Sequence, residues 1–255
     1  PSSTVVAQGV SQEVDSTGRP SFVSTSSSAT LTFDAGGHWS NLVLRTPTTT
    51  VDLDLVGILP GGFLDATSTD FDTVATIADP VQLGYEYQTF GIWETASTDT
   101  VGAFSIGAST PGSNIPTING ATFTGKLAGF YVDPDTGFRF LAFGNVRIDA
   151  NFASRTLAFS SSGTAIRPDF DTAPELRPDL ELRGPTLSYA AGTNSFSGDV
   201  STVGTSLGNM NGTTTGQFYG PSAQELGGVF FLQSSDTTTA FTETYSGAYG
   251  AKQTP

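Results

Sequence analysis

The residues able to do covalent or acid–base chemistry are few in this chain. Among 255 residues it has one histidine, His38, no cysteine, and 24 aspartates and glutamates. A Ser-His-Asp triad would have to use His38, and no Gly-x-Ser-x-Gly motif precedes a helical stretch. A zinc site would need further ligands, and nothing selects one pair of carboxylates for glycoside hydrolysis. We therefore predict no catalytic residue, no metal site and a protein that is not an enzyme.

The pair His38-Trp39 is a candidate for ligand contact. It follows two glycines, so we expect it near a loop tip. There His38 could be an axial ligand of haem iron, with Trp39 stacked on the macrocycle. The alternative is that Trp39 anchors a core and His38 lies beside it at the surface. The aromatic residues Tyr85, Tyr87 and Trp93 have the same two interpretations, a binding patch or a packed sheet face. Haem is the one cofactor that these residues suggest.

The charge of the chain limits its classes of partner. The formal net charge is -14, with only 10 lysines and arginines. An acidic surface repels nucleic acid and anionic membranes, so both are poor candidates for a partner, and we expect no nucleic acid to bind. The sequence contains no run of 18 apolar residues, so we predict no transmembrane helix. We expect an extracellular or cell-surface protein whose partner is another protein or a small solute.

Alternating apolar and polar residues predict an all-β protein. The alternation is clearest from Phe138 to Phe152, where one face of a long strand is apolar. We expect a β-rich domain at residues 1–118, with an extended N-terminal arm, and a small closed antiparallel barrel of eight strands at residues 119–255. The serine-rich residues 21–28 are predicted to be an exposed edge or loop, and residues 65–79 a loop.

The stretch from Gly216 to Phe230, GQFYGPSAQELGGVF, is the most specific pattern in the chain. A strand is expected to end at a Gly-Pro turn, and Ser222 to cap one helical turn over residues 223–226. The two following glycines would end that turn at positive φ and start another strand. We therefore predict a corner rather than a hairpin. The residues given a structural role are Gly216, Phe218, Tyr219, Gly220, Pro221, Glu225, Leu226, Gly227 and Gly228.

This motif resembles the barrel signature of the transferrin-binding protein B-like surface proteins, whose barrel is shared with factor H-binding and heparin-binding surface antigens. The order Thr110-Pro111, Ile115-Pro116, Gly120 and Phe123 resembles the segment that connects the family's handle domain to its barrel. The resemblance implies a handle at residues 1–118 and a barrel at residues 119–255. It also implies a place on the outside of a Gram-negative bacterium and binding of a host protein, haem or another solute.

Two non-enzymatic functions stay open at this point. The first is a surface or secreted binding protein whose ligand the sequence does not identify. The second is a self-assembling structural protein, a homo-oligomer or polymer, in which the N-terminal arm adds a strand to the next subunit. The Thr-, Ser- and Gly-rich composition and the extended arm favour considering the second alternative.

Overall fold

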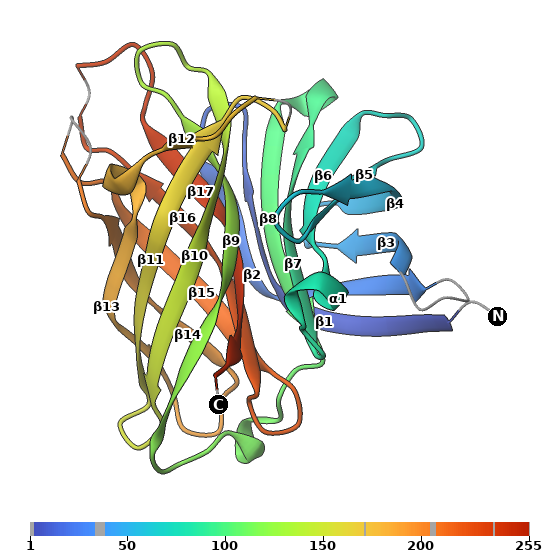
Figure 1. Cartoon of the computed structure of the whole chain (residues 1–255), viewed down its shortest axis with the longest axis vertical. Coiled ribbons are helices and arrows are strands. Elements are labelled where there is room, and N and C mark those ends of the chain that lie inside the picture. Colours follow the sequence, from blue (N-terminus) through green and yellow to red (C-terminus); the bar gives the residue numbers. More distant parts are fainter. Residues whose placement is uncertain (1–2, 34–38, 171, 205–207, 237, 255) are drawn as a thin grey trace.

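The computed structural model describes residues 3–33, 39–170, 172–204, 208–236 and 238–254. Its strands form two closed antiparallel barrels of eight strands each, lying side by side (Figure 1). The first barrel closes through pairing of its first and last strands, β1 and β8. Its strands are β1 Ser3–Val14, β2 Pro20–Phe33, β3 Trp39–Arg45, β4 Thr50–Leu59, β5 Phe63–Thr67, β6 Thr73–Ala78, β7 Gln88–Thr95 and β8 Thr100–Gly107.

The second barrel closes through pairing of β10 with β11. Its strands are β9 Gly120–Val132, β10 Arg139–Asn151, β11 Thr156–Arg167, β13 Leu182–Tyr189, β14 Ser195–Thr202, β15 Asn211–Tyr219, β16 Glu225–Gln233 and β17 Thr244–Gln253. The short strand β12 Glu175–Leu176 adds to the edge of β11. The helical segments are α1 Pro80–Leu83 and the 3₁₀ turns Ala96–Thr98, Gly112–Asn114 and Pro178–Leu180.

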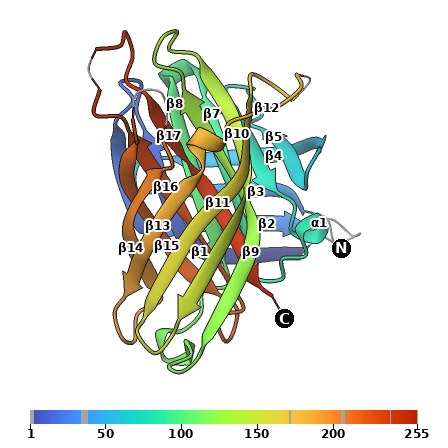
Figure 2. The ribbon, with the colours of Figure 1, turned by 60° about the vertical axis from the view of Figure 1, so that its left-hand side comes forward.

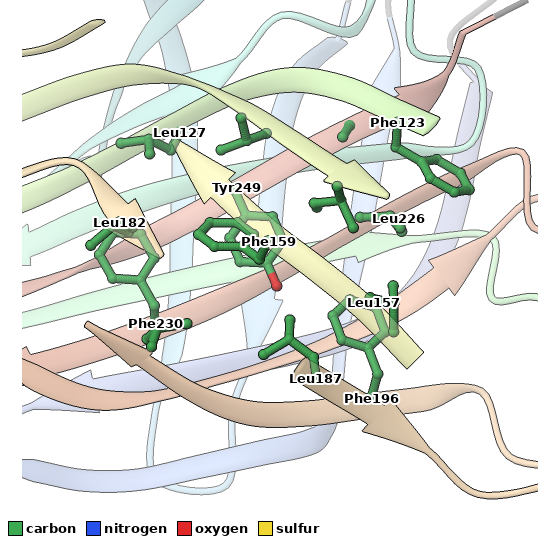
Figure 3. Packing of buried hydrophobic residues seen from close by; sticks show 14 of the residues in the cluster. Phe123, Leu127, Leu157, Phe159, Leu182, Leu187, Phe196, Leu226, Phe230 and Tyr249 are labelled. Carbon is green, nitrogen blue, oxygen red and sulfur yellow. The ribbon is translucent and has the colours of Figure 1, made fainter. Parts of the chain in front are cut away.

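The second barrel follows the predicted alternation of its sequence. In β10 the residues Ala142, Val146 and Ile148 are buried, while Asn145 and Arg147 between them are exposed. Inward-facing side chains from all eight strands fill the barrel with aromatic rings and leucines (Figure 3). This filling is typical of small barrels, whose interior side chains form the core rather than leave a channel. The prediction of an all-β chain with a closed eight-stranded second half is confirmed.

The first half is β-rich, as expected for residues 1–118, but residues 3–14 are not an extended arm. It is itself a closed barrel, with its own core around Leu42, Leu53 and Trp93. Residues 3–14 are β1, which pairs with β2 on one side and β8 on the other. Serine-rich residues 21–28, expected to be an edge or loop, lie within β2. Residues 63–67 and 73–78 are strands rather than parts of a loop.

The predicted corner is a hairpin. β15 and β16 pair antiparallel up to Tyr219 and Glu225, and residues 220–224 form the turn between them. Gly220 has φ 87°, the left-handed region that glycine tolerates. Gly227 and Gly228 lie inside β16 and have no positive φ, so they do not end a helical turn. The helical turn expected over residues 223–226 does not form, because the pairing to β15 already includes Glu225.

Gly227 is required by the contact between the two barrels. A Cβ at this position would lie 2.3 Å from Ser105 Oγ and 2.5 Å from Gln88 Oε1, both on the first barrel. Gly9 and Gly107 of the first barrel make room in the same way for the ring of Tyr219. These glycines let strand backbones approach closely, which larger residues would prevent.

Polar groups along this contact reach across to backbone atoms of the opposite barrel. The Gln88 Nε2 donates to the carbonyl oxygens of Leu226 and Ala251, each at 2.9 Å. Tyr219 Oη donates to Ser105 O at 2.7 Å, and Tyr85 Oη donates to Gly250 O at 2.6 Å. An apolar cluster that includes Phe90, Ile92, Phe130 and Val229 fills the remaining space between the barrels. The two barrels are therefore joined by a packed, hydrogen-bonded interface.

The buried carboxylate of Glu225 completes this interface. It accepts hydrogen bonds from the backbone N–H groups of Glu86, at 2.7 Å, and Tyr87, at 3.1 Å. Burial raises the pKa of the Glu225 carboxyl, and these backbone hydrogen bonds oppose that rise. The predicted structural role of Glu225 thus takes the form of a contact between the barrels.

We expect Gly227→Ala to lower the free energy of unfolding by about 2 kcal/mol, because the new methyl group overpacks the interface. Chemical denaturation measures this change. Gly57→Ala in β4 is the matched control: its Cβ would meet no atom within 4 Å, so we expect a change within about 0.5 kcal/mol. Equal stability of the two variants would contradict the close approach at Gly227.

A second prediction concerns pH. Because the folded-state pKa of Glu225 lies above the ordinary 4.5, its contribution to stability is fully present below pH 4.5 and is lost as the pH rises through the folded pKa. Glu225→Gln lacks this titration. The melting temperature of the parent minus that of the variant should therefore fall between pH 4 and pH 7. A rise over this range would mean that the backbone hydrogen bonds outweigh burial.

Candidate apolar binding site at the mouth of the first barrel

A pocket of about 300 Å³ opens at the mouth of the first barrel. Side chains of β1 and β2 form one wall, and α1 with the residues after it forms the other. The lining is largely apolar: Val5, Ala7, Leu31, Phe33, Pro80, Val81, Tyr85, Glu86, Tyr87, Gln88, Thr89, Ile106, Gly107 and Ala108. It is a site for an apolar group that enters from the surface.

The strand alternation positions the first wall. Val5 and Ala7 lie on the same face of β1, opposite Leu31 and Ala29 of β2. Ala7 and Leu31 belong to the buried core of the barrel, whereas Val5 is 51% exposed at its rim. The apolar face of the sheet therefore continues from the core into the open pocket.

The short helix α1 positions the second wall. The Asp79 side chain caps the helix by accepting from Val81 N at 2.9 Å, and Pro80 occupies the first turn. Gly84 ends the helix in the left-handed conformation, with φ 68°. This geometry leaves Val81 70% exposed beside the pocket. An exposed valine on a rigidly capped turn is suited to contact with a partner.

The polar groups around the pocket form hydrogen bonds that fix its wall in place. Tyr85 Oη points to the second barrel and donates to Gly250 O, and burial raises its pKa. Among the residues that the structure describes, no group of three or more His, Asp or Glu side chains could hold a metal ion. None of the helices in the described ranges is long and apolar enough to cross a membrane. The size and largely apolar lining of the pocket suit an apolar group.

The structure brings two of the sequence-predicted ligand residues to this pocket. Tyr85 and Tyr87 both line it, Tyr85 buried and Tyr87 half-buried. Trp39 and Trp93 are 4% and 1% exposed and pack in the core of the first barrel, which favours the packing interpretation of both. His38 lies outside the described residues. A ligand role for any of the five stays a prediction.

Sequence reasoning missed the other residues of the pocket. Val5 and Val81 lie in stretches too short to display a binding pattern, and Phe33 reads as an ordinary strand residue. The one sequence signal for the second wall is the Asp79-Pro80 pair followed by Gly84, which predicts a short capped helical turn. The pocket itself depends on the pairing of β1 with β8, which periodicity does not predict.

We expect Tyr85→Phe to lower the free energy of unfolding by about 1 kcal/mol, because it removes the hydrogen bond to Gly250 O. Tyr87→Phe is the control: within the described part of the chain the Tyr87 hydroxyl has no hydrogen-bond partner, so its loss should change stability by less than about 0.5 kcal/mol. Urea titration of both variants checks this. Equal losses would contradict the role of the Tyr85 hydroxyl in joining the barrels.

Comparisons with known proteins agree with this architecture. Transferrin-binding protein B of Haemophilus influenzae (strain 86-028NP) is 27% identical over 183 residues, 65% of this chain and 27% of that protein. Transferrin binding protein B of Haemophilus parasuis Hp5 superposes with a TM-score of 0.63 and 19% identity, over 98% of this chain and 45% of that one. The chain thus spans less than half the length of these two proteins.

A second similar structure is HpuA of Kingella denitrificans in complex with human haemoglobin, with a TM-score of 0.51 and 12% identity, over 100% of this chain and 88% of that one. At these identities the structural likeness establishes the fold. The family described as the C-lobe and N-lobe beta barrels of Tf-binding protein B matches residues 115–253. This match covers more than half of the chain, and the chain therefore belongs to that family.

Proposed function

We propose that this chain is a non-enzymatic binding protein on the outside of a Gram-negative bacterium, and that its partner is a host protein. The observation that carries the proposal is the family match over residues 115–253. The relatives support it by their names: one is a transferrin-binding protein, and the HpuA structure is a complex with human haemoglobin. The proposed partner is therefore a protein that carries iron or haem in the host.

The apolar pocket at the mouth of the first barrel is the proposed contact. Interfaces between proteins are built around buried apolar anchors in pockets, surrounded by a polar rim. Here Leu31, Phe33 and Ile106 form the apolar lining, Val5 and Val81 are exposed at its edge, and Glu86 supplies a charge at the surface. An apolar side chain of the partner would enter between α1 and β1.

The same proposal gives the two barrels different roles. We infer that residues 1–118 act as the handle domain of this family and carry the partner contact. Residues 119–255 would be the barrel that supports the handle. The supporting observation is that the pocket is lined by the first barrel, α1 and the segment that follows it.

Binding to immobilised protein by interferometry tests the proposal, with human transferrin and human haemoglobin as the analytes. We expect one of them to bind, and Val81→Asp to weaken that binding at least tenfold, because a carboxylate would have to be buried with the entering apolar side chain. Val203→Asp is the matched control. Val203 is 52% exposed and lies after β14, on the second barrel.

Two outcomes would count against the proposal. If neither host protein bound, the partner class would be wrong. If one bound and both aspartate variants bound equally well, the host partner would stand but the pocket would not be its contact. A thermal melt of both variants shows whether a loss of binding comes from a loss of folding. We expect both variants to fold, because each replaced valine is largely exposed.

A further inference from the structure

A second cleft runs along the seam between the barrels, on the outer face of β9, β10 and β11. It consists of two adjoining pockets of about 250 Å³ and 420 Å³ that share Lys126 and Asn145. The second barrel supplies the floor. The first barrel supplies the wall, through the turn after β4 at Pro60 and Gly61 and through Leu83 at the end of α1. We call this cleft the seam groove.

The seam groove is basic, although the chain as a whole is acidic. Its lining includes Lys126, Arg147, Arg167 and Lys252, which are four of the chain's 10 basic residues and include both of its lysines. No aspartate or glutamate is among the residues that line either pocket. In a protein of net charge -14, this concentration of positive charge is a local reversal of the surface potential.

The two lysines are not neutralised by acidic neighbours. Lys126 Nζ donates to Asn145 Oδ1 at 2.7 Å, and Lys252 Nζ donates to Gly84 O at 3.2 Å. Across the described ranges, neither ammonium group forms an ion pair with a carboxylate. Both lysines therefore retain their positive charge for a ligand, because amide and carbonyl oxygens carry none to cancel it.

The two arginines are held at the ends of the groove. Arg147 donates from Nε and Nη2 to the two carboxylate oxygens of Asp149, at 3.0 Å and 2.7 Å, so its charge is paired with that of Asp149, and both side chains are about half exposed. The Arg167 guanidinium lies over the ring of Phe170, with its carbon 4.0 Å from the centroid, and near Asp169. Its Nε is buried and has no hydrogen-bond partner among the described residues.

The basic residues are spaced along the strand direction. Arg147 and Lys252 flank Thr124 of β9 on either side, and Lys126 follows two residues later on the same face, roughly 7 Å away. Arg167 pairs with Leu141, which pairs with Phe130. The row of charge therefore extends from Thr124 to Phe130 along β9, roughly 20 Å.

We propose that the seam groove binds an extended acidic peptide segment of a partner protein, with carboxylates at alternate positions. In an extended chain, the side chains on one face repeat roughly every 7 Å, which matches the step from the Arg147–Lys252 row to Lys126. Gly163 lies in the floor with only Asn145 Nδ2 within 4 Å of where a Cβ would be, which leaves room for the peptide backbone. The groove is distinct from the apolar pocket. Tyr85 is the one residue that lines both.

The experiment uses a fluorescein-labelled peptide of alternating Glu and Ser, titrated with the whole chain at low ionic strength and followed by fluorescence anisotropy. We expect saturable binding that weakens as salt rises. The double variant Lys126→Gln and Lys252→Gln should bind at least tenfold more weakly. The double variant Arg19→Gln and Arg45→Gln carries the same net charge, removes exposed residues outside the groove, and should bind within twofold of the parent.

Three results would overturn the proposal. One is no binding of the acidic peptide by the parent chain. Another is equal weakening by the two double variants, which would assign the binding to net charge alone. The third is a heparin oligosaccharide that binds to the groove while the peptide does not, which would make the ligand a sulfated polysaccharide. Failure of transferrin and haemoglobin to bind would leave this proposal unaffected, since the peptide titration uses neither protein.

Discussion

Close approach of two barrel walls is the constraint on which the rest of this structure depends. Strands normally carry side chains on both faces, so side chains of one barrel can reach the backbone of the other only where the facing side chains are missing. Gly9 and Gly107 on one side and Gly227 on the other remove them. Gln88 and Glu225 can then reach across the seam to backbone groups of the opposite barrel. Gln88 Nε2 and the Glu225 carboxylate find partners there, whereas Gln88 Oε1 is buried without a hydrogen-bond partner among the described residues, which costs free energy.

The same seam shapes both the apolar pocket and the seam groove. The residues from Tyr85 to Gln88 are tied to the second barrel by their hydroxyl, backbone and amide groups. This fixes α1, just before them, as a wall of the apolar pocket on one side and of the seam groove on the other. Figure 2 shows α1 projecting from the body of the first barrel near the second. A site built on anchored elements keeps its geometry before a partner arrives, which lowers the cost of binding.

The sequence was informative where burial follows a local period. The burial of β10 alternates regularly, so its inward residues could be predicted, whereas β17 is buried on both faces because it lies against the first barrel. Residues 21–28 could not, because their serines read as a loop. In the structure Ser24 and Ser27 are buried, Ser27 is bonded to Ser11, and Thr25 O accepts from Gln217 of the second barrel. Small residues are needed there because another barrel lies close, and that neighbour is far away in the sequence.

The candidate site was predictable only in part, for a similar reason. Tyr85 and Tyr87 were identified as aromatic residues, but the pocket also needs Val5 and Phe33, which non-local pairing brings to them. Trp39 and Trp93 looked equally suitable for a ligand, and closure of the first barrel buries both. Gly227 and Gly228 were misread as the end of a helical turn, since a glycine pair cannot by itself distinguish positive φ from close packing.

The central claim is that the carboxylate of Glu225 joins the two barrels by holding the backbone of Glu86 and Tyr87. Amide hydrogen exchange tests this directly, because these two N–H groups have a side-chain partner on the other barrel. The account predicts that both amides exchange as slowly as amides in the middle of β16. Exchange as fast as that of amides in exposed turns would contradict it, and would mean that the barrels separate readily.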